Sequence, residues 1–198
     1  IETITGTLAD VTAALAAVNE ARNVNVTITG TLTSTDLAEL NAITTSGVIK
    51  ATVVGTVADL AALNTAATDA ITLKITGDSV LATELSTLDS KTSVVVNASA
   101  VKEIKGTATE LKAIYTSKTI SGLGNEDVSF DDPAAVAADD VNAILKATTG
   151  KVTATVTAAD AESLNKDLKD AKATDALTLT VNGTAATAAE LNALDGKT

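Results

Sequence analysis

The chain has 198 residues and a formal net charge of −11, with 45% apolar residues but only 1% aromatic residues. It contains no histidine and no cysteine, which excludes Ser-His-Asp and Cys-His nucleophile systems and the usual zinc, iron–sulfur and haem ligand sets. The acidic surface disfavours contact with nucleic-acid phosphates and anionic lipids, and no apolar run approaches the ~20 residues of a membrane span. We therefore expect no enzyme, no nucleic-acid partner and no membrane span.

A short pattern recurs along the chain, beginning with Gly6-Thr7 and the acid Asp10. Each recurring acid precedes apolar residues spaced three or four apart, which is typical of the buried stripe of a short helix. Later copies of the glycine–threonine pair stand at Gly30-Thr31, Gly55-Thr56, Gly106-Thr107 and Gly183-Thr184. The period of about 25 residues predicts a tandem repeat of about eight copies.

Strands are predicted between the helices, because four segments alternate apolar and polar residues with the period of two that a half-buried strand shows. These segments are 26–29, 71–76, 152–157 and 177–181. Their polar positions are mostly threonine, so we expect one sheet face to pack on helices and the other to be exposed and rich in threonine.

Helix starts are predicted from threonines that have an acid three residues later, the pattern of a capping box. Asp131, Asp132 and Pro133 predict an acidic cap with proline in the first turn for the helix that follows them. Lysines in 89–92, 116–119 and 195–198 are expected to place a cation at helix C-termini. The capping threonines are Thr7, Thr33, Thr56, Thr107, Thr157 and Thr187.

Strand and helix in strict alternation, joined by short links, predict parallel strands with right-handed crossovers. The predicted fold is therefore an α/β, open, two-layer right-handed solenoid of about eight ~25-residue strand–helix repeats, with a parallel sheet and one exposed Thr-rich face. We predict a single domain over 1–198 that is a slice of a longer array. Irregular insertions are expected near 93–105 and 120–133.

The region around 126–140 gathers carboxylates, and oxygen ligands suit calcium. Glu126, Asp127, Asp131 and Asp132 are the candidate calcium ligands, with calcium as the candidate cofactor. The competing interpretation is helix capping, which also accounts for Asp139 and Asp140. No catalytic or cofactor-binding residue is predicted.

Two segments carry a resemblance: 188–198 (AAELNALDGKT) and 82–92 (ATELSTLDSKT). They resemble tandem repeats of very large acidic secreted or cell-surface proteins of marine cyanobacteria and related bacteria. The resemblance covers most of the chain as degenerate copies. It implies a role in a surface layer, a fibril or an adhesive stalk, and it carries over no site residues.

The expected function is structural: a non-catalytic extracellular or cell-surface fibre, surface layer or adhesive spacer whose partner is itself or more of the same array. The alternative is a binding module for glycan, protein or ice that uses the threonine face or the 121–132 loop. A bacteriophage fibre segment is a further alternative.

Overall fold

The computed structural model describes residues 2–18 and 23–198, which form an α/β fold with two parallel sheets and, within those residues, eight α-helices. The two sheets belong to two compact units, so the single sheet expected from the sequence is divided. The first unit comprises Ile1–Gly77, Glu84–Ala100 and Lys118–Gly122; the second comprises Asp78–Thr83, Val101–Ser117 and Leu123–Thr198.

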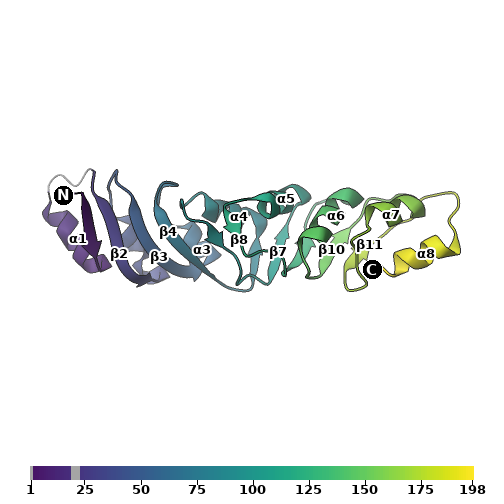
Figure 1. Cartoon of the computed structure of the whole chain (residues 1–198), viewed down its shortest axis with the longest axis horizontal. Helices are drawn as coiled ribbons and strands as arrows, with labels where there is room; N and C mark the ends of the chain where they lie inside the picture. The colour runs from purple at the N-terminus through teal and green to yellow at the C-terminus, as the bar shows by residue number, and fades with distance from the viewer. Residues whose placement is uncertain (1, 19–22) are drawn as a thin grey trace. The chain divides into compact units, whose positions relative to one another are not determined.

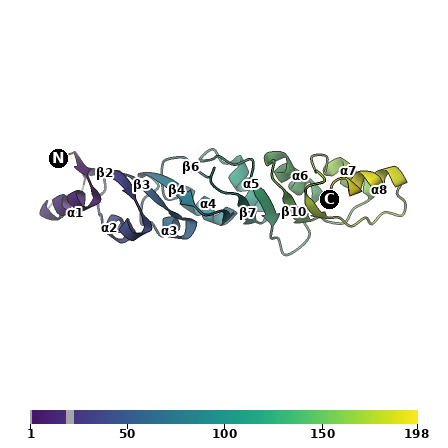
Figure 2. The ribbon, with the colours of Figure 1, turned by 90° about the horizontal axis from the view of Figure 1, so that it is seen from below.

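The first unit contains a six-stranded sheet in the order β1-β2-β3-β4-β6-β8. Helices α1, α2 and α3 lie along the same side of its strands (Figure 2). Its strands are β1 (Thr3–Gly6), β2 (Asn25–Leu32), β3 (Ile49–Thr56), β4 (Ala70–Thr76), β6 (Val96–Asn97) and β8 (Ile120–Ser121). Its helical segments are α1 (Leu8–Ala17), the 3₁₀ turn η1 (Ser34–Asp36), α2 (Leu37–Asn41) and α3 (Val57–Ala61).

The second unit contains a five-stranded sheet in the order β11-β10-β9-β7-β5, of which β7, β10 and β11 are labelled in Figure 1. Helix α4 (Ala82–Asp89) starts in this unit and ends in the first. The strands are β5 (Ser79–Leu81), β7 (Glu103–Gly106), β9 (Asp127–Phe130), β10 (Val152–Thr155) and β11 (Ala176–Thr178). The helices are α5 (Ala108–Thr116), α6 (Ala138–Ala147), α7 (Ala161–Asp167) and α8 (Ala188–Asp195).

The strands pair in parallel in both units, with one irregularity: the register of β2 against β3 shifts between Thr27 and Thr31. In the first sheet Lys50 of β3 pairs with Ala70 of β4, and Val96 of β6 pairs with Ile120 of β8. In the second sheet Glu103 of β7 pairs with Asp127 of β9. Partners thus lie nearly one repeat apart in the sequence, at a spacing slightly below the predicted period of about 25 residues.

Burial along the strands follows the predicted alternation. In β4 the apolar side chains of Ile71, Leu73 and Ile75 are buried, whereas Thr72 and Lys74 between them are exposed. The helices bury the matching apolar stripe, as Leu111 and Ile114 do in α5. The core therefore lies between the sheet and the helices in each unit.

The segment expected to be an irregular loop at 121–132 is partly strand. Ser121 ends β8, and Asp127–Phe130 is β9, which pairs in register with β7. The segment near 93–105 likewise holds β6 and the start of β7. Both segments therefore contribute strands to the sheets. These strands are short, but they pair in parallel with their neighbours as the longer strands do.

Candidate functional site

The first candidate calcium ligand, Glu126, is buried and already engaged. Its side chain is 1% exposed, and one carboxylate oxygen accepts a hydrogen bond of 2.8 Å from the Gly124 amide. The Asn125 amide and the Tyr115 hydroxyl also donate to this carboxylate. Burial, together with the hydrogen bond to Glu126, raises the pKa of Tyr115 above its ordinary value. Glu126 therefore organises the turn before β9 and holds the end of α5 against it.

The other candidate ligands point to separate backbone amides. Asp127 Oδ1 accepts from the Lys151 amide at 2.7 Å, and Asp132 Oδ2 accepts from the Ala108 amide at 2.9 Å. Asp131 is exposed, and its own amide donates to the Gly106 carbonyl. Among residues 2–18 and 23–198 no group of three or more acidic side chains is placed to hold a metal ion.

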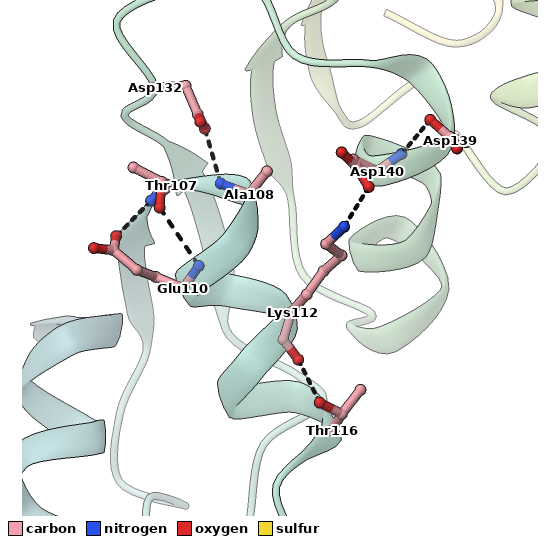
Figure 3. Close-up of polar contacts among 8 residues, drawn as sticks. All are labelled: Thr107, Ala108, Glu110, Lys112, Thr116, Asp132, Asp139 and Asp140. Atoms are coloured by element: carbon pink, nitrogen blue, oxygen red, sulfur yellow. Dashed lines mark hydrogen bonds and ion pairs between the residues drawn. The ribbon is translucent and has the colours of Figure 1, made fainter.

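The N-terminus of α5 shows how these acids are used (Figure 3). The Thr107 hydroxyl accepts from the Glu110 amide, and Glu110 accepts from the Thr107 amide at 2.8 Å, so the predicted capping box is present. Asp132, from the next repeat, accepts a hydrogen bond from the Ala108 amide. A helix leaves its first amides without internal partners, and here a neighbouring repeat supplies one of the acceptors.

Capping boxes also form at Thr56 and Thr187, and the Thr7 hydroxyl accepts from the Asp10 amide, as predicted. At Thr33 the carboxylate of Asp36 reaches back to the Thr33 amide, but the first turn is 3₁₀. The backbone hydrogen bond from Thr187 lowers the pKa of Glu190 below its usual value.

Two predicted caps are wrong. Helix α7 starts after Asp160, which accepts from the Ser163 amide, so Asp160 is the cap and Thr157 is not. Helix α6 starts after Ala137, so Asp131, Asp132 and Pro133 do not begin it. In both places the strand-like pairing of the preceding residues, Val136 with Val156 and Ala159 with Val181, delays the helix.

Two of the three predicted cations, Lys91 and Lys197, bind carbonyl groups of the preceding repeat instead of the last turn of their own helix. Lys91 Nζ donates to the Leu63 carbonyl and Lys197 Nζ donates to the Leu168 carbonyl, each at 2.8 Å. A further lysine, Lys112 of α5, forms an ion pair with Asp140 of α6 (Figure 3), which raises the pKa of Lys112. These contacts join adjacent repeats.

In each unit, buried polar side chains accept hydrogen bonds from amides at the strand starts. Asp69 is 4% exposed; its two oxygens accept from the Ile49 amide and the Ala66 amide at 2.8 and 2.7 Å. Thr92 accepts from the Ile71 amide in the same unit. In the second unit Asp175 accepts from the Val152 amide at 2.9 Å. Each acceptor stands about one repeat after the strand that it caps.

Each unit also has a threonine–x–glycine turn before a strand, with Thr45 half-buried and Thr148 buried. The Thr45 hydroxyl donates to the Val24 carbonyl and accepts from the Gly47 amide. The Thr148 hydroxyl makes the same pair of bonds, to the Glu126 carbonyl and from the Gly150 amide. The two turns occur in different units, so the device is repeated.

Sequence reasoning missed these polar acceptors before the strands. The signal that was available is an Asp or Thr one to four residues before several of the strands, as at Asp69 and Thr92. The signal is weak because both residue types are common in the chain and their partners lie a whole repeat away.

The hollows of the first unit hold no catalytic arrangement among its described residues. One, of about 610 Å³, is lined in part by Thr45, Asn64 and Asp69, and both carboxylate oxygens of Asp69 already accept backbone hydrogen bonds. The other, of about 470 Å³, is lined by uncharged residues that include Thr12, Leu15 and Ile43. Neither presents a pair of carboxylates for acid–base chemistry.

No helix within the described residues is both long enough and apolar enough to cross a bilayer.

Comparison with known proteins adds no relative. No family model, no curated protein and no solved structure matches the chain.

Proposed function

We propose that this chain is a solenoid of stacked α/β repeats and acts as a non-catalytic structural segment of an extracellular or cell-surface protein. In this role it supplies length and surface to a fibre, a surface layer or an adhesive spacer. The repeat-to-repeat hydrogen bonding carries the proposal. Asp69 accepts a hydrogen bond from the Ile49 amide 20 residues earlier, and Asp132 accepts one from the Ala108 amide 24 residues earlier.

Such bonding supports a structural role because each repeat leaves polar groups that only its neighbour satisfies. Stability in an array of this kind is a sum of repeat terms and neighbour terms, so the array can be extended without a new core. The carboxylates that could serve in catalysis are instead used as caps, as Asp69, Glu126 and Asp175 show.

A binding module is the second candidate, and one observation favours it. Thr31, Thr52 and Thr72 pair in register across β2, β3 and β4. They are exposed or half-buried on the sheet face opposite the core and so form one row of the proposed Thr-rich face. Lys50 and Lys74 interrupt this face, which favours a glycan or an acidic protein over the regular lattice of ice.

The structural proposal is tested by locating the protein. Antibodies against the 198-residue chain are applied with gold label to intact and permeabilised source cells in the electron microscope. Labelled filaments or coat on intact cells support the proposal. Label confined to the cell interior contradicts it, and label on phage particles assigns the chain to a phage fibre. Saturable binding of the purified chain to a glycan array supports the second candidate.

A further inference from the structure

Each sheet ends in a strand that has a free edge. Strand β1 pairs with β2 and stands at the end of the first sheet, and β11 pairs with β10 and stands at the end of the second. An edge strand carries a row of backbone N–H and C=O groups that can pair with another chain.

The backbone hydrogen bonds between strands follow one rule in both units. Core-facing residues hydrogen-bond to the next strand, as the Val26 amide does to the Val48 carbonyl and the Val96 amide does to the Thr119 carbonyl. Residues on the outer face bond to the previous strand, as the Asn25 amide does to the Glu2 carbonyl and the Asp127 amide does to the Lys102 carbonyl.

Of the four edge strands, β1 and β8 in the first sheet and β5 and β11 in the second, the free sides of β1 and β11 fit this rule as a complementary pair. The Thr178 carbonyl is used by the Val156 amide, so the polar backbone groups of Leu177 and Leu179 point to the free side. Beside β1, the Glu2 carbonyl accepts a hydrogen bond from the Asn25 amide. The backbone N–H and C=O groups of Thr3 and Thr5 therefore point to the free side. The free side of β11 therefore offers core-facing residues and that of β1 offers outer-face residues, as at every internal pair.

Apolar side chains beside β11 are exposed to solvent. Leu191, the first apolar residue of the stripe in α8, is 46% exposed, whereas Leu111 and Leu164 at the matching positions of α5 and α7 are 0% exposed. Val181, which pairs with Ala159 of the preceding repeat, is 38% exposed.

Helix α1 presents one small apolar residue, Ala14, on the side away from α2. Thr12 of α1 bonds to Glu39 of α2, so the Thr12 side of α1 faces α2. Ala14 comes two residues later, about 200° around the helix, and so lies on the side away from α2. A side chain as large as Leu191 fits best against such a small residue.

We propose that a second copy of this chain docks its β1–α1 face onto the β11–α8 face, so that copies join head to tail and the parallel strand ladder continues. The inference rests on the proposed structural function and names its partner. The contact is heterologous, joining two different surfaces, so that copies add one after another into an open filament or a closed ring.

The test uses sedimentation velocity of the 198-residue chain over a concentration series up to about 1 mM, the weak end of protein association. Leu191→Glu places a charge on one face. Its matched control is Leu81→Glu, because Leu81 is 43% exposed in β5 and the charge change is the same. Thr5→Pro removes an outward amide from the other face, and Thr5→Ala is its control because it keeps the amide.

We expect the unmodified chain to form oligomers larger than a dimer, and we expect Leu191→Glu and Thr5→Pro each to raise the concentration of half-association at least about tenfold. The two controls stay close to the unmodified chain. An equimolar mixture of Leu191→Glu and Thr5→Pro forms a dimer and no larger species, because only one intact face of each kind remains.

A chain that is monomeric throughout the series overturns the inference, and so do controls that weaken association as much as the test variants. Dimers of Thr5→Pro alone also overturn it, since they show that two β11–α8 faces pair with each other. None of these outcomes changes where gold label is found on cells, so failure here is distinct from failure of the proposed function.

Discussion

The Asp132 carboxylate accepts a hydrogen bond from the Ala108 amide at 2.9 Å, across 24 residues of chain. The acceptor belongs to the segment that follows β9, and the donor belongs to the first turn of α5. A helix cap, usually a local device, here connects two repeats.

Replacing Asp132 by alanine therefore has a long-range effect. We expect Asp132→Ala to lower the free energy of unfolding by about 1 kcal/mol, the usual cost of a lost cap, as measured by urea denaturation. Hydrogen exchange at the Ala108 amide should also become faster. Asp131→Ala is the control, because Asp131 is exposed and its neighbour holds the bond. Equal losses in the two variants would show that Asp132 acts only through its charge.

Local patterns in the sequence predicted the local structure well. The threonine–acid spacing predicted the caps at Thr56, Thr107 and Thr187, and these are confirmed. The alternation in 71–76 predicted β4, which is also confirmed. Both patterns depend on residues within one turn or one strand, and for this reason a single sequence reveals them.

Contacts across a repeat could not be predicted in the same way. The role of Asp132 on Ala108 and that of Glu126 under Tyr115 depend on which residues the stacking brings together. The acids of 126–132 were grouped as calcium candidates because they are close in sequence. Their carboxylates are nevertheless directed to different amides: Glu126 accepts from Gly124, Asp127 from Lys151 and Asp132 from Ala108, and only Asp127 of these acids lies in β9.

The threonine–x–glycine turns give a second prediction. A Cβ on Gly47 would fall well inside van der Waals contact with the Val24 carbonyl, and one on Gly150 would do the same with the Glu126 carbonyl. We expect Gly47→Ala and Gly150→Ala each to lower the free energy of unfolding by about 2–3 kcal/mol, because backbone must shift. In the control Gly196→Ala the nearest atom to the new Cβ is 3.7 Å away. Denaturation midpoints that match this control would contradict the assigned turns.

Tyr115 gives a prediction in alkaline solution. Its folded-state pKa is raised by burial and by Glu126, so its contribution to stability is complete below about pH 10, tyrosine's ordinary pKa, and is lost as the pH rises above it. Because Tyr115 is the only tyrosine, ultraviolet titration of the phenolate reports it directly. We expect the native chain to titrate later than the urea-unfolded chain.

Tyr115→Phe serves as the matched variant. It should cost about 1–2 kcal/mol at neutral pH, since Glu126 stays buried with one donor fewer. The alkaline loss of stability that depends on the tyrosine should then be absent. Identical titration of native and unfolded chains would refute the buried contact.

The helix–sheet seam gives the fourth prediction. Leu111 is 0% exposed on the stripe of α5 that faces the core. Leu111→Asp buries an unpaired carboxylate and should cost about 3 kcal/mol or more in chemical denaturation. Ala113→Asp, two residues along on the exposed side, is the control with the same added charge. Similar stability of the two variants would show that the assigned core face of α5 is wrong.

The cross-repeat caps also determine how such a chain can change in length. Duplicating one whole period places a new acid 20–24 residues after each amide that needs it, so all the caps are regenerated. Inserting a few residues moves the acid away from its amide and breaks the caps on both sides. Evolution by unequal recombination would therefore retain gains and losses in whole periods and remove the intermediate lengths.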